Sequence, residues 1–131
     1  MRTLTDHKLN GLNEALAITV LDDPGAGGAC HKYSISLNVP PDDPIGIAPD
    51  SLRTHWEIDF QNGPIQEAKY NGLSGEALMA VLIDRLRSFQ AGPYKCRENA
   101  CALTHLEEAL MWLQKRTRER LARGVEGTHK V

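Results

Sequence analysis

The sequence predicts an α+β fold in which a small antiparallel β-sheet is followed by a C-terminal antiparallel helical hairpin. Residues 12–70 contain short runs that alternate apolar and polar side chains, as half-buried strands do. Residues 71–128 instead repeat apolar side chains at helical spacing on both sides of one Gly-Pro break. The 131 residues suit a single domain. Residues 1–11 are polar and mixed in charge, so we expect a loose leader there.

Two runs near the start of the chain predict a β-hairpin. Residues 15–21 are apolar and partly β-branched, which favours a strand. Residues 31–37 alternate with a period of two and place Tyr33 and aliphatic side chains on one face. Residues 22–29 lie between these runs and contain three glycines. We therefore expect residues 22–29 to form the turn.

Two further runs complete the predicted sheet. Residues 54–60 alternate large apolar and polar side chains. Asn62 and Gly63 form a strong turn signal, so residues 65–70 are predicted to pair back as a fourth strand. Residues 39–51 hold four prolines and three aspartates, and we expect them to form a loop.

The C-terminal part predicts two helices joined by a short break. Residues 76–89 repeat leucine and phenylalanine at helical spacing, after Ser74 as the N-cap. The break falls at Gly92-Pro93, and a second helix with a leucine stripe over residues 103–113 ends before Gly124. Helices joined so closely should lie antiparallel. Because such a hairpin has apolar surface to spare, we expect it to need another layer or another subunit.

Bulk composition excludes several classes of protein. The formal net charge is −2, which predicts neither DNA binding nor an acidic tail. The three cysteines form no C-x-x-C pair and the five histidines are scattered, so we expect no metal site and no cofactor. No signal peptide opens the chain, and no apolar run reaches the roughly 20 residues of a membrane helix. These features favour a soluble cytoplasmic protein.

Two residues beside the glycine turn are candidates for a binding site. The turn could cradle a phosphate with backbone N–H groups. It lacks the lysine-serine ending of a P-loop and no helix pattern follows it, so a long hairpin turn is the favoured interpretation. His31 and Tyr33 come next, and a histidine beside a lysine is more often a solvated strand residue than a catalytic base. No nucleophile signature or paired carboxylates accompany them, so we expect no enzyme activity.

The second helix carries candidate ligand contacts at both of its ends. Its last turns contain a basic run from Lys115 to Arg123. This run is either a solvated face whose cations suit the helix dipole or a site where arginine forks capture an anion or phosphate. At the first turn, Arg97 and Asn99 offer a guanidinium and an amide that can contact a base. The nearby Phe89 or Tyr94 could stack on a base.

A set of short motifs in the C-terminal half is more specific than any of these single residues. The motifs are Asn71-Gly72-Leu73, Glu76-Ala77-Leu78, Ile83-Asp84-Arg85-Leu86, Phe89-Gln90, Gly92-Pro93-Tyr94, Cys96-Arg97-Glu98-Asn99-Ala100, Leu106-Glu107-Glu108-Ala109-Leu110-Met111-Trp112-Leu113 and Arg123-Gly124-Val125-Glu126-Gly127-Thr128. Together they resemble the helical hairpin of phage cyclic-nucleotide sponges. The upstream sheet makes the chain similar to the first Thoeris anti-defence family, whereas a smaller anti-CBASS sponge family shares the hairpin and lacks the sheet. The resemblance is dense over residues 60–128 and looser over residues 12–40.

The resemblance implies a non-enzymatic role in the cytoplasm of an infected bacterium. Sponges of this kind sequester glyco-cyclic ADP-ribose, the nucleotide signal made by bacterial immune sensors, so that the effector is not activated. They form dimers that assemble into hexamers. Some also hold cyclic di- or trinucleotides at separate sites. The resemblance therefore implies a homo-oligomer whose partner is a small cyclic nucleotide, with no membrane and no nucleic acid polymer.

The resemblance also implies which residues contact the ligand. By analogy with the family's site, Phe89 stacks on the adenine, Asn99 forms a hydrogen bond and Arg116 clamps base or phosphate. Arg97 is a candidate for a second site that depends on the oligomer. The two residues beside the glycine turn are added from this sequence alone. The candidate ligand-binding residues are therefore Phe89, Asn99, Arg116, Arg97, His31 and Tyr33.

Two other functions are compatible with parts of this pattern. A small DNA-binding or transcription-regulatory protein would use the basic run as a recognition face, but it predicts a clearly positive domain. A salt-sensitive gel shift would favour it. An enzyme that degrades the nucleotide signal would release altered ligand, whereas a sponge releases intact ligand on denaturation.

Overall fold

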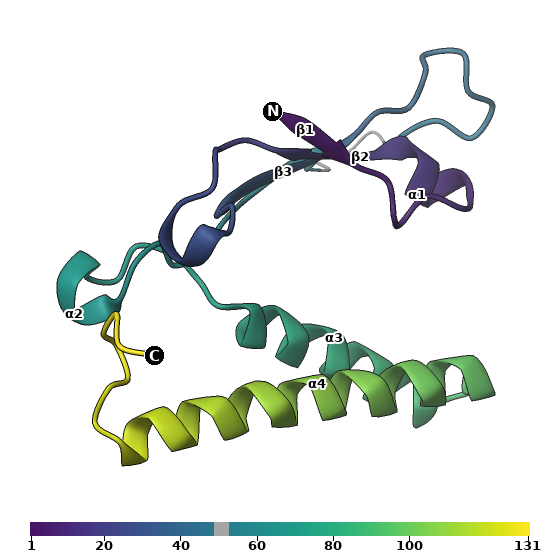
Figure 1. Cartoon of the computed structure of the whole chain (residues 1–131). Helices are drawn as coiled ribbons and strands as arrows, with labels where there is room; N and C mark the ends of the chain where they lie inside the picture. Colours follow the sequence, from purple (N-terminus) through teal and green to yellow (C-terminus); the bar gives the residue numbers. More distant parts are fainter. Residues whose placement is uncertain (49–52) are drawn as a thin grey trace. The chain divides into compact units, whose positions relative to one another are not determined.

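The computed structural model describes residues 1–48 and 53–131, which fold into two compact units (Figure 1). The first unit runs from Met1 to Gly63 and the second from Pro64 to Val131. The boundary lies seven residues before the predicted end of the sheet region at residue 70, because the segment after Gly63 joins the helices. The organisation of both units as one domain stays a prediction.

The first unit is a four-stranded antiparallel sheet. Its strands are β1 (Arg2–Leu4), β2 (Leu16–Val20), β3 (Lys32–Leu37) and β4 (His55–Asp59), and they pair in the order β1-β2-β3-β4. The three strands β2, β3 and β4 confirm the predicted ones, and the α+β fold class is confirmed with them. Within this unit, Val20 is the most deeply buried apolar side chain among the described residues, with 1% of its surface exposed.

The sheet packs its aromatic side chains on the face that the alternation predicts. Val20 lies opposite Tyr33, and Tyr33 lies opposite Ile58 across the ladder. The Tyr33 ring also meets Phe60 edge to face, with ring centroids 5.7 Å apart. Along β4, the apolar positions are half-buried and the polar positions are exposed, as expected for a strand with one covered face.

The prediction of a loose leader over residues 1–11 is wrong. Residues 2–4 form β1, which pairs with β2 in the register Arg2–Val20 and Leu4–Ile18. A short helix, α1 (Gly11–Ala15), then begins where the Asn10 side chain accepts a hydrogen bond from the Asn13 N–H group at 3.0 Å. A three-residue edge strand owes its conformation to its neighbour in the sheet, so its own sequence carries little signal.

The prediction of a strand over residues 65–70 is also wrong. Residues 65–68 form the one-turn helix α2 (Ile65–Ala68), preceded by Pro64 as its N-cap. Lys69 ends the turn with φ 62°, and its N–H group bonds back to the carbonyl of Ile65 at 3.0 Å. The fourth strand of the sheet is β1 instead.

The predicted loop over residues 39–51 agrees with the structure where it can be compared. Residues 39–48 contain no helix or strand. Residues 49–51 of this prediction lie outside the described residues.

The second unit is the predicted helical hairpin, built from α3 (Gly75–Gln90) and α4 (Arg97–Ala122), which lie side by side in Figure 1. The Ser74 hydroxyl caps α3 by accepting from the Ala77 N–H group at 3.1 Å, as predicted. Gly124 follows α4 with φ 71°, the left-handed conformation that favours glycine at this position. Arg87 near the end of α3 donates to Glu107 in the first half of α4 at 2.8 Å, and only residues 91–96 join the two helices, so they run antiparallel.

The hairpin leaves much apolar surface uncovered. Ile83 is the buried apolar side chain of this unit among the described residues, with 3% of its surface exposed. By contrast, Val81 is 58% exposed, and Trp112 and Leu121 are each 61% exposed. None of the described helices is apolar over a stretch long enough to cross a membrane.

Candidate functional site

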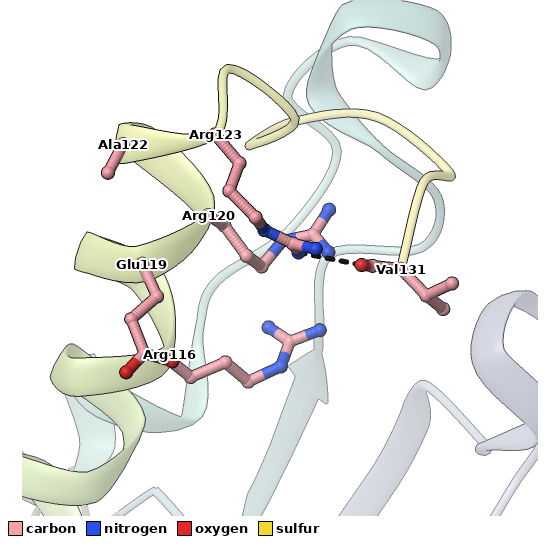
Figure 2. Close-up of a pocket in the computed structure, with 6 residues that line it drawn as sticks. All are labelled: Arg116, Glu119, Arg120, Ala122, Arg123 and Val131. Carbon is pink, nitrogen blue, oxygen red and sulfur yellow. Dashed lines mark hydrogen bonds between the residues drawn. The ribbon is translucent and has the colours of Figure 1, made fainter.

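A pocket lined by arginines lies at the C-terminal end of α4, and we call it the arginine pocket (Figure 2). Its volume is about 680 Å³. Its lining residues are Arg116, Glu119, Arg120, Ala122, Arg123 and Val131. Pockets that bind small molecules have volumes of roughly 300–1,000 Å³. The arginine pocket is therefore large enough for a nucleotide-sized ligand.

Helical spacing brings the three arginines of the pocket together. Arg116, Arg120 and Arg123 are separated by four and three residues along α4 and its C-cap, so they share one stripe of the helix. Figure 2 shows their guanidinium groups directed to the same side of the helix. Like charges on one stripe repel, so this arrangement is stable only where acceptors compensate the charge.

Two of the three guanidinium groups have such acceptors within the chain. Arg120 is buried and donates to the Glu126 carboxylate at 3.1 Å and to three backbone carbonyls. Arg123 donates to the Val131 carbonyl at 2.6 Å. The exposed Arg116 has no hydrogen-bond or ion-pair partner in the part of the chain that the structure describes. Its fork is free to bind an anion.

The single carboxylate of the pocket lining is held by a lysine. Lys115 donates a hydrogen bond to Glu119, one helical turn later. This hydrogen bond is the main reason why the pKa of Glu119 is lowered, and the charges of Lys115 and Arg123 add to the effect. Glu119 therefore stays ionised at neutral pH. In Figure 2 its carboxylate points away from the guanidinium groups, so the pocket presents cations.

A second group of predicted residues lies at the opposite end of the hairpin. Phe89 is 38% exposed, and the Arg85 guanidinium lies 5.2 Å from the centre of its ring, a cation–π contact. Arg97 and Asn99 occupy the first turn of α4, where Cys96 is the N-cap. Arg97 is exposed and Asn99 is half-buried. We call this region the turn end of the hairpin.

The turn end and the arginine pocket are far apart within one chain. Asn99 and Arg116 are 17 residues apart on the continuous helix α4, which corresponds to about 26 Å at 1.5 Å per residue. One cyclic nucleotide cannot contact both places in the same hairpin. The structure thus places Phe89, Arg97 and Asn99 at the turn end and Arg116 with the other arginines.

His31 and Tyr33 belong to the first unit and serve its glycine turn. The His31 ring nitrogen Nε2 lies 3.0 Å from the Ala26 carbonyl, and His31 is buried rather than solvated as the sequence suggested. The Tyr33 hydroxyl donates to the Cys30 carbonyl at 3.4 Å. Both side chains are hydrogen-bonded within the turn region, and their role in ligand binding stays a prediction.

An aspartate closes the same turn. The backbone N–H groups of His31 and Lys32 donate to the Asp22 carboxylate at 3.0 to 3.2 Å. The hydrogen bond from His31 is the largest cause of a lowered pKa at Asp22. The glycine turn is therefore a pinned hairpin turn. Asp22 could not be singled out from the sequence, because its partners are backbone N–H groups, which have no sequence signature.

The described residues contain no candidate metal-binding site. Within residues 1–48 and 53–131, no three histidine, cysteine or acidic side chains gather closely enough to hold a metal ion.

Fold and pocket together define a helical-hairpin protein with an arginine-lined pocket at one end of the hairpin. Residues 54–118 match the family model of the Acb2/Tad1 hairpin domain. The chain therefore carries a hairpin domain of the Acb2/Tad1 family, and the resemblance predicted from the sequence is confirmed. Arg116 lies inside the matched region, and Arg120 and Arg123 follow it.

The chain is also similar to a named phage protein. The chain is 58% identical over 72 residues to "Thoeris anti-defense 1" of Bacillus phage SBSphiJ7. The aligned part covers 55% of this chain and 51% of the relative. The chain thus matches about half the length of this relative.

Proposed function

We propose that the protein is a phage anti-defence sponge that binds glyco-cyclic ADP-ribose and holds it unaltered, so that the immune effector is not activated. The Acb2/Tad1 hairpin domain and the relative named for Thoeris anti-defence support this function. Cyclic di- or trinucleotides are a second ligand class, bound at a separate site around Arg97. The protein acts in the cytoplasm of the infected host.

The unpartnered guanidinium of Arg116 is the observation that carries this proposal. Its neighbours Arg120 and Arg123 already donate to acceptors of the chain, whereas Arg116 extends into the same pocket without one in the described structure. Arginine presents a planar fork that fits phosphate oxygens in a bidentate manner. A cyclic ADP-ribose derivative carries a pyrophosphate, which supplies the missing acceptors.

A complete site requires two copies of the chain. Phe89 and Asn99 lie at the turn end, about 26 Å along α4 from Arg116 by helical rise. Two hairpins that pack antiparallel would place the turn end of one chain beside the arginine pocket of its partner. A ligand in this seam is enclosed on both faces. We therefore assign Phe89 and Asn99 to the base and the partner's Arg116 to the phosphates.

The uncovered apolar side chains of the hairpin favour such pairing. Trp112 and Leu121 on α4 and Val81 on α3 are each more than half exposed. Burying apolar surface between subunits contributes about 25 cal/mol per Å². Dimers built in this way can assemble further into the proposed hexamer.

Binding without catalysis agrees with the chemistry of the pocket lining. The side chains that line it are three guanidinium groups, two small apolar groups and one carboxylate held by Lys115. Guanidinium groups stay protonated and bind anions, but they do not act as nucleophiles or bases at neutral pH. The pocket therefore retains a phosphate compound rather than cleaving it.

Calorimetry with the purified protein and glyco-cyclic ADP-ribose tests the proposal. A sponge that competes with a tight receptor needs a Kd of about 1 nM, or roughly 12 kcal/mol of binding free energy. We expect saturable binding, and chromatography of the heat-denatured complex should return the ligand intact. The absence of heat at micromolar concentrations would rule out the sponge, and altered ligand would indicate an enzyme.

A further inference from the structure

Arg120 organises the segment that follows α4. It is 7% exposed, and its Nε donates to the Glu126 carboxylate at 3.1 Å. Its two terminal nitrogens donate to the carbonyls of Val125 at 2.9 Å, Thr128 at 3.1 Å and Lys130 at 2.6 Å. Residues 125–130 are thus folded around one guanidinium group, and we call them the C-terminal clip.

The clip is also held from its other side, by α2. The Gln66 N–H group donates to the Gly127 carbonyl at 3.2 Å, and a histidine of the clip, His129, pairs with Glu67. Gly127 has φ 78°, and a Cβ at this position would lie 3.0 Å from the Ile65 side chain. Glycine is therefore required here both by conformation and by the close approach of α2.

The clip shapes the arginine pocket. Arg120 lines the pocket and holds the clip at the same time. Val131, the residue after the clip, is a wall of the pocket and accepts the hydrogen bond of Arg123. An opened clip would remove this wall and free the Arg123 side chain. The geometry of the anion site thus depends on a segment that does not itself include Arg116.

We propose that Arg120 is a positioning residue, which orders the C-terminal clip and thereby sets the affinity of the arginine pocket for a phosphate ligand. The inference rests on the proposed function. This role requires the planar guanidinium group of arginine with its five N–H donors. A lysine at this position would carry the same charge but could not donate to all four acceptors. The clip lies beyond residue 118, where the match to the family model ends.

Glu126→Ala separates positioning from simple electrostatics, because the two accounts predict opposite signs. Glu126 binds Arg120 but does not line the pocket. If charge alone mattered, the loss of a carboxylate near cations would strengthen the binding of an anion. If the clip positions the pocket, the loss of its anchor weakens binding by about tenfold, the effect of one charged hydrogen bond.

Two further variants complete the test. Gly127→Ala disturbs the clip without changing any charge, so it should also weaken binding by about tenfold. Its matched control is Gly75→Ala, because a Cβ at Gly75 meets nothing within 4 Å and binding should be unchanged. Arg120→Lys keeps the charge, and we expect it not to rescue affinity.

Calorimetry and amide hydrogen exchange on the full chain give the deciding readouts, with glyco-cyclic ADP-ribose and inorganic pyrophosphate as probes. We expect Glu126→Ala and Gly127→Ala to lose protection at residues 125–130, to keep the protection of α3 and to bind more weakly. Unchanged or tighter binding by these variants, or full affinity in Arg120→Lys, would overturn the inference. A wild-type chain that binds pyrophosphate but not glyco-cyclic ADP-ribose contradicts only the proposed function, and the variants are then compared on pyrophosphate. Binding of neither probe overturns both.

Discussion

The two ends of the helical hairpin both carry arginines, but they differ in how these side chains are buried and hydrogen-bonded. At the turn end, Phe89 and Arg97 are exposed, and the Phe89 ring makes a cation–π contact with Arg85. At the other end, Arg120 is buried in a network of backbone carbonyls, and Arg116 beside it has no polar partner among the described residues. The turn end offers an aromatic ring, and the pocket end offers guanidinium groups, two of which are held in place by hydrogen bonds. A ligand with a base and a pyrophosphate needs both kinds of surface.

The largest effect is expected at the pocket end, from Arg116→Ala. Truncating one partner of an enclosed charge pair costs several kcal/mol, so affinity for glyco-cyclic ADP-ribose should fall by about 100-fold, or ~2.7 kcal/mol. The oligomer measured by light scattering should be unchanged, because Arg116 makes no hydrogen bond or ion pair within the described residues. Arg118→Ala is the matched control, since Arg118 is exposed on the same helix but does not line the pocket. Equal affinity of both variants for the ligand would mean that the ligand binds outside the arginine pocket.

At the turn end, Phe89→Ala should have the next largest effect. Stacking of a base on an aromatic ring contributes about 1–3 kcal/mol, so calorimetry should show a loss of roughly tenfold. Tyr94 is 77% exposed in the same turn region and is the alternative stacking residue, so Tyr94→Ala distinguishes the two rings and should bind like the wild type. Wild-type affinity in Phe89→Ala would remove the turn end from the site.

The smallest effect is a dependence of stability on pH at the pocket end. The lowered pKa of Glu119 adds stability above its ordinary value of 4.5, and this addition is lost as the pH falls through the lowered folded-state value. The unfolding temperature of the wild type should therefore exceed that of Glu119→Gln near neutral pH, and the two temperatures should converge at acidic pH. A gap that persists at low pH would mean that the Lys115 pair is not the cause.

The two ends also differ in how well the sequence predicts them. Both helices and the Ser74 cap follow from apolar spacing and local side-chain chemistry, so their prediction is confirmed. The basic run is compatible with either a solvated face or an anion site near Arg116. The structure provides a pocket there, and anion binding stays a prediction. Arg120 could not be distinguished from its neighbours in the sequence, because most of its acceptors are backbone carbonyls, which any residue could supply.

The sheet unit shows the same limit. β2, β3 and β4 alternate clearly enough to be predicted. β1 and α2 were assigned wrongly, since a three-residue strand and a four-residue helix are decided by what they pack against. The turn before β3 was predicted as a turn, but the hydrogen bonds of Asp22 and His31 that fix it are contacts of the folded chain.

A complementation experiment tests most directly the claim that one site spans two chains. Phe89→Ala and Arg116→Ala are each expected to bind weakly alone. When the two variants are co-expressed with different tags and purified as mixed oligomers, some seams combine an intact Phe89 with an intact Arg116 of the partner chain. The account predicts that calorimetry of the mixed oligomers recovers a fraction of sites with wild-type affinity. Mixed oligomers that bind no better than either variant alone would contradict it.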